Sequence, residues 1–116
     1  MCGYPEKNRG IISMDKKQVV EIVRNYAEVV KNHLSVKKVI LYGSHAKESA
    51  GKDSDIDVAV VLDAIKGDYL STGALLFKLS RDIDLRIEPV LVEQGNDVSG
   101  FLDEITKTGE VVYSAE

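Results

Sequence analysis

The sequence predicts a small α/β (α+β) domain in which helices cover a mixed sheet of three to four strands. Segments with helical spacing of apolar residues alternate with short, β-branched runs, which is typical of this class. The chain has 116 residues, enough for one hydrophobic core, and 44% apolar with 29% charged residues is the balance of a globular protein. We therefore expect one folded domain over residues 14–116.

Residues 1–13 mix glycine, proline, asparagine and charges without periodicity, so we expect a poorly ordered N-terminal segment. This segment lacks the long apolar centre of a secretory signal, and no apolar run of the chain reaches membrane-spanning length. The single cysteine, Cys2, cannot form an intrachain disulfide, which fits a reducing compartment. We expect a cytoplasmic protein with no membrane partner.

The net charge argues against a nucleic-acid partner. Fifteen basic and nineteen acidic side chains give a formal net charge of -4, and no stripe of lysine and arginine interleaved with aromatic residues follows any element. The oligomeric state is left open, with a homo-oligomer among the options.

The first half of the domain begins with a helix and a strand. A helix is expected from Asp15 to Leu34, because apolar residues recur there with helical spacing and Asp15 followed by Gln18 resembles a capping box. Val36–Tyr42 is expected as a strand, since it is short, β-branched and followed by Gly43.

A short helix or turn is expected over Ser44–Ser49, and a second strand over Ser54–Leu62. Helical spacing returns in Tyr69–Asp82. Leu85–Val92 is expected as a third strand, and its Pro89, which removes one donor of the ladder, places it at an edge or beside a bulge.

The chain should end with a helix over Ser99–Thr108, stopped by Gly109, and a last extended piece over Glu110–Tyr113. The order of the strands in the sheet cannot be derived from these patterns, because the short link between the first two strands allows either direction of pairing.

Two acids stand inside the second strand, where a charged side chain is costly unless something pairs with it. Asp55 and Asp57 lie two residues apart and thus share one strand face, with Cα atoms roughly 6.5 to 7 Å apart. Their carboxylates could converge on a pair of metal ions, and magnesium prefers such oxygen ligands. The alternative is a solvated face of a half-exposed strand.

Gly43 and Ser44 precede these acids, at the point where a buried strand ends and a short helix is expected. Glycine lets a phosphate approach the backbone, and the serine hydroxyl with the free N–H groups of a helix start can hold phosphate oxygens. Taken alone, glycine followed by serine is a common turn pair.

A third carboxylate, Glu88, stands among apolar residues in the middle of the third strand. If that strand lies beside the second, Glu88 could complete the acidic face and act as general base on an attacking hydroxyl. The alternative is a solvent-facing residue of an edge strand. Asp82 and Asp84 are the nearest competitors for its role.

The spacing of these residues resembles the signature of the DNA polymerase β nucleotidyltransferase superfamily: Gly43–Ser44, ten residues, then Asp55–Ile56–Asp57 after the strand VILY. More narrowly, the length and order of elements resemble the minimal nucleotidyltransferases. These are single-domain proteins often encoded beside a helical HEPN protein, as the antitoxin half of a toxin–antitoxin pair. The resemblance covers Asp15 to Tyr113.

The resemblance implies that Gly43 and Ser44 contact the phosphates of a nucleoside triphosphate and that Asp55 and Asp57 bind two Mg²⁺ ions. Glu88 matches the third acid, which in such enzymes binds metal or activates the acceptor. Family members transfer a nucleoside monophosphate, typically AMP from ATP, to a hydroxyl. In the antitoxin group this hydroxyl is a tyrosine of the partner toxin.

Two positions depart from the family pattern. Many relatives have arginine directly after the Gly–Ser pair and again two residues on, where this chain has His45 and Lys47. Lys47 can still meet a phosphate as a point charge, whereas His45 is not a fixed cation at neutral pH. The third acid is glutamate rather than the aspartate common in relatives.

Our leading hypothesis is therefore a Mg²⁺-dependent nucleotidyltransferase of the protein adenylyltransferase type that acts as an antitoxin. A non-catalytic antitoxin that blocks its partner by contact alone is the main alternative. An aminoglycoside-type nucleotidyltransferase is a further alternative, although the chain lacks the length for a second domain. A polymerase fragment should have carried a basic groove.

Overall fold

The computed structural model describes residues 16–43, 46, 55–65, 67–96 and 100–115. Within these residues the chain forms three α-helices, one short 3₁₀ helix and four strands. They follow one another as α1 (Lys16–Lys31), β2 (Val36–Tyr42), β3 (Ile56–Leu62), α2 (Tyr69–Arg81), β4 (Ile87–Glu93), η1 (Gln94–Asn96), α3 (Phe101–Thr108) and β5 (Glu110–Ser114). The predicted small α/β domain with a mixed, helix-covered sheet is confirmed.

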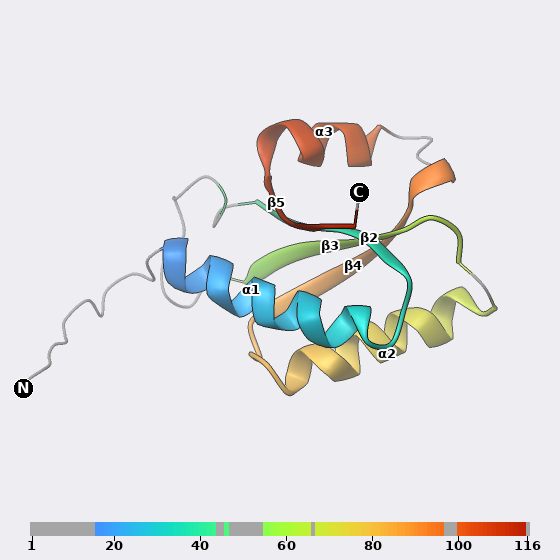
Figure 1. The fold of residues 1–116 in the computed structure, drawn as a ribbon, viewed down its shortest axis with the longest axis horizontal. Helices are drawn as coiled ribbons and strands as arrows, with labels where there is room; N and C mark the ends of the chain where they lie inside the picture. The colour runs from blue at the N-terminus through green and yellow to red at the C-terminus, as the bar shows by residue number, and fades with distance from the viewer. Residues whose placement is uncertain (1–15, 44–45, 47–54, 66, 97–99, 116) are drawn as a thin grey trace, which may run out of the picture.

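The four strands form a single sheet in the order β4-β3-β2-β5. β2 pairs antiparallel with β3 and with β5, whereas β3 pairs parallel with β4. As Figure 1 shows, α1 and α2 lie on one side of this sheet and α3 lies on the other. β4 is an edge strand, as its Pro89 predicted.

Alternating side chains of β3 divide the core into two layers. Ile56, Val58 and Val60 belong to the larger apolar cluster, which is formed with α1 and α2. Ala59 and Val61 belong to a smaller cluster with Ile105 of α3. Asp57 has the same parity as the second set, so its side chain lies on the α3 side of the sheet.

The two helices of the larger layer are joined by a buried hydrogen bond. The Tyr26 hydroxyl of α1 donates to the Leu76 carbonyl of α2 over 2.8 Å, and burial raises the pKa of Tyr26 far above its ordinary value. The Leu76 carbonyl would otherwise lack part of its hydrogen bonding inside the core. α1 and α2 therefore pack as one layer behind the strands that carry the acids.

Several expected boundaries differ slightly from the observed ones. β3 begins at Ile56, not at Ser54, and β4 spans Ile87–Glu93, not Leu85–Val92. The shift of β4 follows from Asp84, whose carboxylate ties the Arg86 backbone N–H into a turn before the strand begins. The last extended piece is confirmed as β5, while η1 was not anticipated.

Some expectations fall on parts that the structure does not describe. The N-terminal segment 1–13, the proposed cap at Asp15 and nearly all of the turn Ser44–Ser49 lie outside the described residues. Among the described helices, none combines the length and the apolar character needed to cross a bilayer.

Candidate active site

The candidate site lies where the C-terminal end of β2 meets the N-terminal ends of β3 and β4. Asp57 of β3 is flanked on one side by Tyr42 of β2 and on the other by Glu88 of β4. Residues paired across neighbouring strands have their side chains on the same face, and neighbouring strands lie about 4.8 Å apart. Tyr42, Asp57 and Glu88 therefore form one row across the α3 side of the sheet.

The structure brings Glu88 beside Asp57, as the sequence argument required. The argument had to assume that their strands are neighbours, and the parallel β3–β4 register now pairs these two residues directly. The Glu88 side chain is exposed, while Asp57 is only partly accessible. An exposed carboxylate next to a partly enclosed one is suited to meet a substrate that arrives from outside the domain.

Asp55 lies just outside the strand in which the sequence placed it. It is exposed and directly precedes Ile56, the first residue of β3 and the partner of Ile87. The strand starts after Asp55 because the pairing of β3 with β2 and with β4 begins only at Ile56 or Asp57. Asp55 therefore stands at the open end of the sheet, two residues before Asp57.

Gly43 is packed directly against Asp57. The backbone of Gly43 has a φ of 78°, in the left-handed region, and a Cβ built at this position would collide with the Asp57 carboxylate, coming within 3.2 Å of its Cγ atom. Only glycine provides this conformation without strain and this free space together. The glycine of the predicted phosphate-binding bend therefore brings the backbone against one of the predicted metal ligands.

Tyr42 forms one wall of the site. Its ring meets the ring of Phe101 from α3 edge to face, with centroids 5.5 Å apart, a favoured geometry for aromatic pairs. Burial and then the negative charge of Asp57 raise the pKa of Tyr42, so this phenol stays protonated at neutral pH. The sequence suggested core or pocket wall for Tyr42 but gave no sign of its partner Phe101, which lies 59 positions further on.

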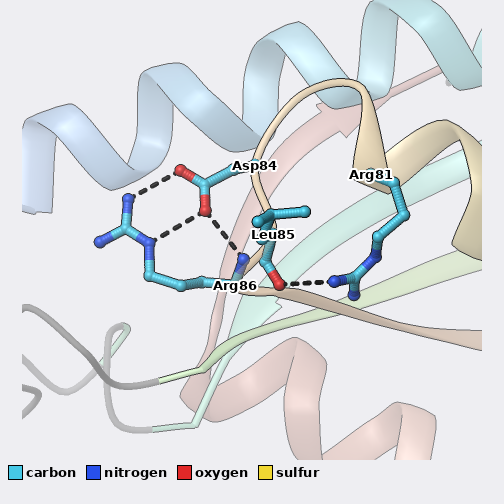
Figure 2. Close-up of polar contacts among 4 residues, drawn as sticks. All are labelled: Arg81, Asp84, Leu85 and Arg86. Atoms are coloured by element: carbon cyan, nitrogen blue, oxygen red, sulfur yellow. Dashed lines mark hydrogen bonds and ion pairs between the residues drawn. The ribbon is translucent and has the colours of Figure 1, made fainter.

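The start of β4 is held by two arginines, which the sequence argument did not single out (Figure 2). The Arg86 guanidinium donates to both carboxylate oxygens of Asp84 over 2.9 and 2.7 Å. Arg81, at the end of α2, donates to the carbonyls of Leu85 and Ile87 over 2.9 and 3.2 Å. We call Arg81, Asp84 and Arg86 the bracket. Their contacts hold the backbone in place immediately before Glu88.

Asp84 is thus excluded as a substitute for Glu88, since its carboxylate is engaged by Arg86. Hydrogen bonding from the Arg86 side chain holds the pKa of Asp84 below its ordinary value, against the opposing effect of burial. Asp82 is exposed in the turn after α2. Of the three acids weighed for the third position, only Glu88 lies in the row with Asp57.

Not every predicted site residue can be placed. Ser44 and Lys47, proposed to contact the phosphates, lie outside the described residues, as does His45. Among the residues that the structure does describe, no three histidine, cysteine, aspartate or glutamate side chains are close enough together to hold a metal ion. The donor set of Asp55, Asp57 and Glu88 nevertheless fits Mg²⁺, which prefers carboxylate oxygens and retains several waters and substrate phosphates as ligands.

Comparisons with known proteins identify the family of the chain. Residues 24–116 match the family model described as polymerase beta, nucleotidyltransferase. A candidate protein adenylyltransferase from Methanocaldococcus jannaschii is 35% identical over 46 residues, which are 40% of this chain. The matched part spans 46% of that relative, less than half of its length.

Solved structures share the fold. A candidate nucleotidyltransferase from Sulfolobus solfataricus superimposes with a TM-score of 0.66 at 18% identity, covering 91% of this chain and 94% of its own. A toxin–antitoxin structure with AMP-PNP gives a TM-score of 0.57 at 19% identity, covering 89% of this chain and 76% of that chain. A mutant of the toxin–antitoxin MntA–HpeT gives 0.56 at 17% identity, with the same coverage of both chains.

At these identities the structural similarities show the fold, while the family follows from the sequence match. That match covers most of the chain and includes every residue of the row across the sheet. The chain therefore belongs to the polymerase β nucleotidyltransferase family, as the Gly–Ser and Asp–Ile–Asp motif indicated.

Proposed function

We propose that the protein is a Mg²⁺-dependent nucleotidyltransferase that transfers AMP from ATP to a tyrosine hydroxyl of a helical partner toxin and so acts as an antitoxin. The observation that supports this most is the row across the sheet: Gly43 abuts Asp57, and Asp57 lies beside Glu88 on the next strand. A phosphate-binding bend, a metal-binding acid and a base for the acceptor hydroxyl are then adjacent.

The residues of the site have different roles in this reaction, and Glu88 has two of them. Asp55, Asp57 and Glu88 would hold Mg²⁺, which when bound would neutralise phosphate charge and make the acceptor hydroxyl more acidic. Gly43, Ser44 and Lys47 hold the triphosphate. The acceptor oxygen forms a bond to the α-phosphorus, the bond from that phosphorus to the bridging oxygen breaks, and pyrophosphate leaves. Glu88 receives the proton of the acceptor hydroxyl.

The acceptor is expected to come from a second protein. Asp55 and Glu88 are exposed, and Glu88 belongs to an edge strand, so a large partner can reach both residues. Two of the structural relatives are toxin–antitoxin structures, one of them with AMP-PNP. These relatives support the nucleotide and the type of partner proposed for this chain, whose catalytic domain we place over residues 14–116.

A contact-only antitoxin is the second candidate. It is favoured by the separation of the acidic side chains, since the described residues contain no ready group of three metal ligands. In that case the fold would serve to cover the partner, and the acids would contribute surface charge. Neutralisation of the partner should require the Asp57 carboxylate if the protein is an enzyme, and should not require it if the protein acts by contact alone.

The test is to incubate the purified protein with Mg²⁺, ATP labelled on the α-phosphate and its co-encoded neighbour, then to map the label by mass spectrometry. We expect one or more AMP groups on a tyrosine of the neighbour, lost when EDTA is added and in the Asp57→Asn variant. Neutralisation of the neighbour that survives Asp57→Asn, with no label transferred from any nucleotide, would favour the contact-only antitoxin instead.

A further inference from the structure

The outer faces of α1 and α2 differ in a way that points to a protein contact. Both helices cover the same side of the sheet. The outer face of α1 is charged, and its side chains pair with one another: Arg24 with Glu21 at 2.6 Å, and Lys31 with Glu28 at 3.1 Å. The outer face of α2 instead exposes Leu70 by 77% and Phe77 by 50%.

These two residues belong to a stripe along α2. Leu70, Gly73, Ala74 and Phe77, which we call the α2 stripe, have the spacing i, i+3, i+4 and i+7 and therefore lie on one side of the helix. The buried residues of the same helix are Leu76, Leu79 and Ser80, and the two leucines point away from the stripe into the core. A helix that is apolar on both sides is normally covered on both sides.

Gly73 gives a second, independent reason to expect that another protein surface packs against the α2 stripe. A glycine inside a helix is less favourable than alanine by about 1 kcal/mol. A Cβ built on Gly73 would meet nothing within 4 Å beyond its chain neighbours and the backbone of its own helix, so packing within the described residues does not require glycine here. A small residue at this position is explained if another backbone approaches it from outside.

We propose that the α2 stripe is the interface of a homodimer, in which the α2 helices of two copies pack antiparallel across a two-fold axis between Gly73 and Ala74. The stripe is symmetric about that point, with a large residue at each end and two small residues in the middle. Leu70 of each copy then meets Phe77 of the other, and the small residues let the helices approach closely. Such self-complementarity is what a two-fold interface requires.

The charges at the two ends of α2 are complementary in the same arrangement. Lys78 and Arg81 occupy the last turn, and the Asp68 carboxylate caps the first turn by accepting from the N–H groups of Leu70 and Ser71. Antiparallel packing places the cationic end of each helix near the anionic end of the other. The Arg81 guanidinium already lies over the Phe77 ring, 4.2 Å from its centroid, at the end of the stripe.

The neighbouring edge of the sheet does not offer an alternative contact by strand addition. In β4, the outward carbonyls of Ile87 and Leu91 accept from Arg81 and from the Tyr69 hydroxyl, and Pro89 has no N–H to donate. An added strand would find few free groups along this edge. The helix face is therefore a better candidate for the contact than this edge.

This dimer would leave both candidate active sites open. The α2 stripe lies on the α1 and α2 side of the sheet, whereas Asp57 and Glu88 lie on the α3 side. The proposal does not rest on the proposed enzymatic activity, and its test needs no substrate.

The first test is the mass of the full-length chain in solution by sedimentation velocity and light scattering. We expect a dimer, and we expect Leu70→Lys to weaken dimerisation by about tenfold or more, since the variant places a charge where an apolar side chain would be buried. Leu85→Lys is the matched control: this leucine is 69% exposed but lies outside the stripe, so the dimer should persist. A wild-type chain that stays monomeric up to about 100 μM would overturn the proposal.

The second test locates the axis and does not depend on how Leu70→Lys folds. In a Cys2→Ser background, Ala74→Cys should form an intermolecular disulfide under mild oxidation, because residue 74 lies beside the two-fold axis. Ser71→Cys, on the flank of the helix, should crosslink far less. Equal crosslinking of the two variants, or a dimer unaffected by Leu70→Lys, would show that the contact lies elsewhere.

Discussion

At the scale of single residues, Gly43 shows how a weak sequence signal becomes a specific one. Glycine followed by serine is a frequent turn pair and says little by itself. In the structure Gly43 combines a left-handed backbone with direct contact to the Asp57 carboxylate. The identity of this one residue therefore determines both the path of the bend and the position of a proposed metal ligand.

We expect Gly43→Ala to lose AMP transfer almost completely, because the new methyl group displaces the Asp57 carboxylate. The left-handed backbone adds a strain of about 1 to 2 kcal/mol. The measurement is the initial rate of labelled AMP transfer together with the free energy of unfolding in urea.

Gly67→Ala provides the control for this prediction. Gly67 also has a positive φ, of 87°, but a Cβ built there meets nothing within 4 Å. Gly67→Ala should thus lose only the stability that backbone strain removes and keep its activity, whereas Gly43→Ala should lose more stability and its activity. If both variants keep the wild-type rate, the contact between Gly43 and Asp57 has no role in the reaction.

The faces of the acids were predictable from the sequence because strand side chains alternate with a period of two. That rule placed Asp57 with Ala59 and Val61, and the structure confirms this set on the α3 side. The contact of Tyr42 with Phe101 was not predictable, since it depends on where α3 packs. A contact between residues that are distant in the chain produces no periodic pattern in the sequence.

At the scale of elements, the connection from α2 to β4 determines where Glu88 stands. The bracket of Arg81, Asp84 and Arg86 holds the backbone of this turn at the Leu85 carbonyl and at the Arg86 N–H, before the strand begins (Figure 2). The Arg86 carbonyl in turn accepts from the N–H of Ile56 over 2.8 Å, which joins the starts of β3 and β4. The turn therefore aligns the two strands that carry the acids.

We expect Asp84→Asn to destabilise the protein at neutral pH and to have little effect in acid. The pKa of Asp84 is lowered in the folded state, so its contribution is complete above the ordinary aspartate value and is lost as the pH falls through the lower folded value. For this partly exposed pair we expect a loss of about 1 kcal/mol at pH 7. Urea unfolding of both proteins between neutral and strongly acidic pH measures the difference.

Glu28→Gln is the control for Asp84→Asn, because the pair of Glu28 with Lys31 is exposed on α1 and should contribute little. A destabilisation by Asp84→Asn that stays constant down to strongly acidic pH would show that the charge of Asp84 is not its cause. Comparable losses in the two variants would instead mean that the bracket is no stronger than a surface ion pair.

The helices and strands were easier to predict than the residues at which they begin and end. The periodicity of α1, α2 and the strands was sufficient to find them, but the start of β4 depends on hydrogen bonds of Asp84 and Arg81 that periodicity does not encode. The same holds for Asp55, which lies outside β3 because the neighbouring strands do not extend to it. The residues at which a strand begins and ends therefore depend on its neighbouring strands and on hydrogen bonds of the adjacent turn.

At the scale of the whole molecule, strand order creates the site. Residues 57 and 88 become neighbours only because β3 and β4 pair in parallel, with α2 as the connection between them. The sequence supplied the acids and their faces, but pairing of distant strands is a property of the assembled sheet. The placement of β3 between β2 and β4 then brings the Gly43 bend and Glu88 to opposite sides of Asp57.

If this central site binds ATP with Mg²⁺, the nucleotide should stabilise the entire domain, because a ligand of the native state shifts the folding equilibrium. A ligand at about one hundred times its dissociation constant adds about 2.7 kcal/mol, which for a domain of this size raises Tm by roughly 10 °C. We expect this shift when ATP and Mg²⁺ are present together, and a much smaller one with Mg²⁺ alone or with ATP and EDTA. Asp57→Asn should abolish the shift, whereas Glu28→Gln, remote on α1, should retain it. Thermal unfolding by circular dichroism measures Tm for each variant and ligand mixture, and an equal rise in wild type and Asp57→Asn would place the nucleotide elsewhere on the protein.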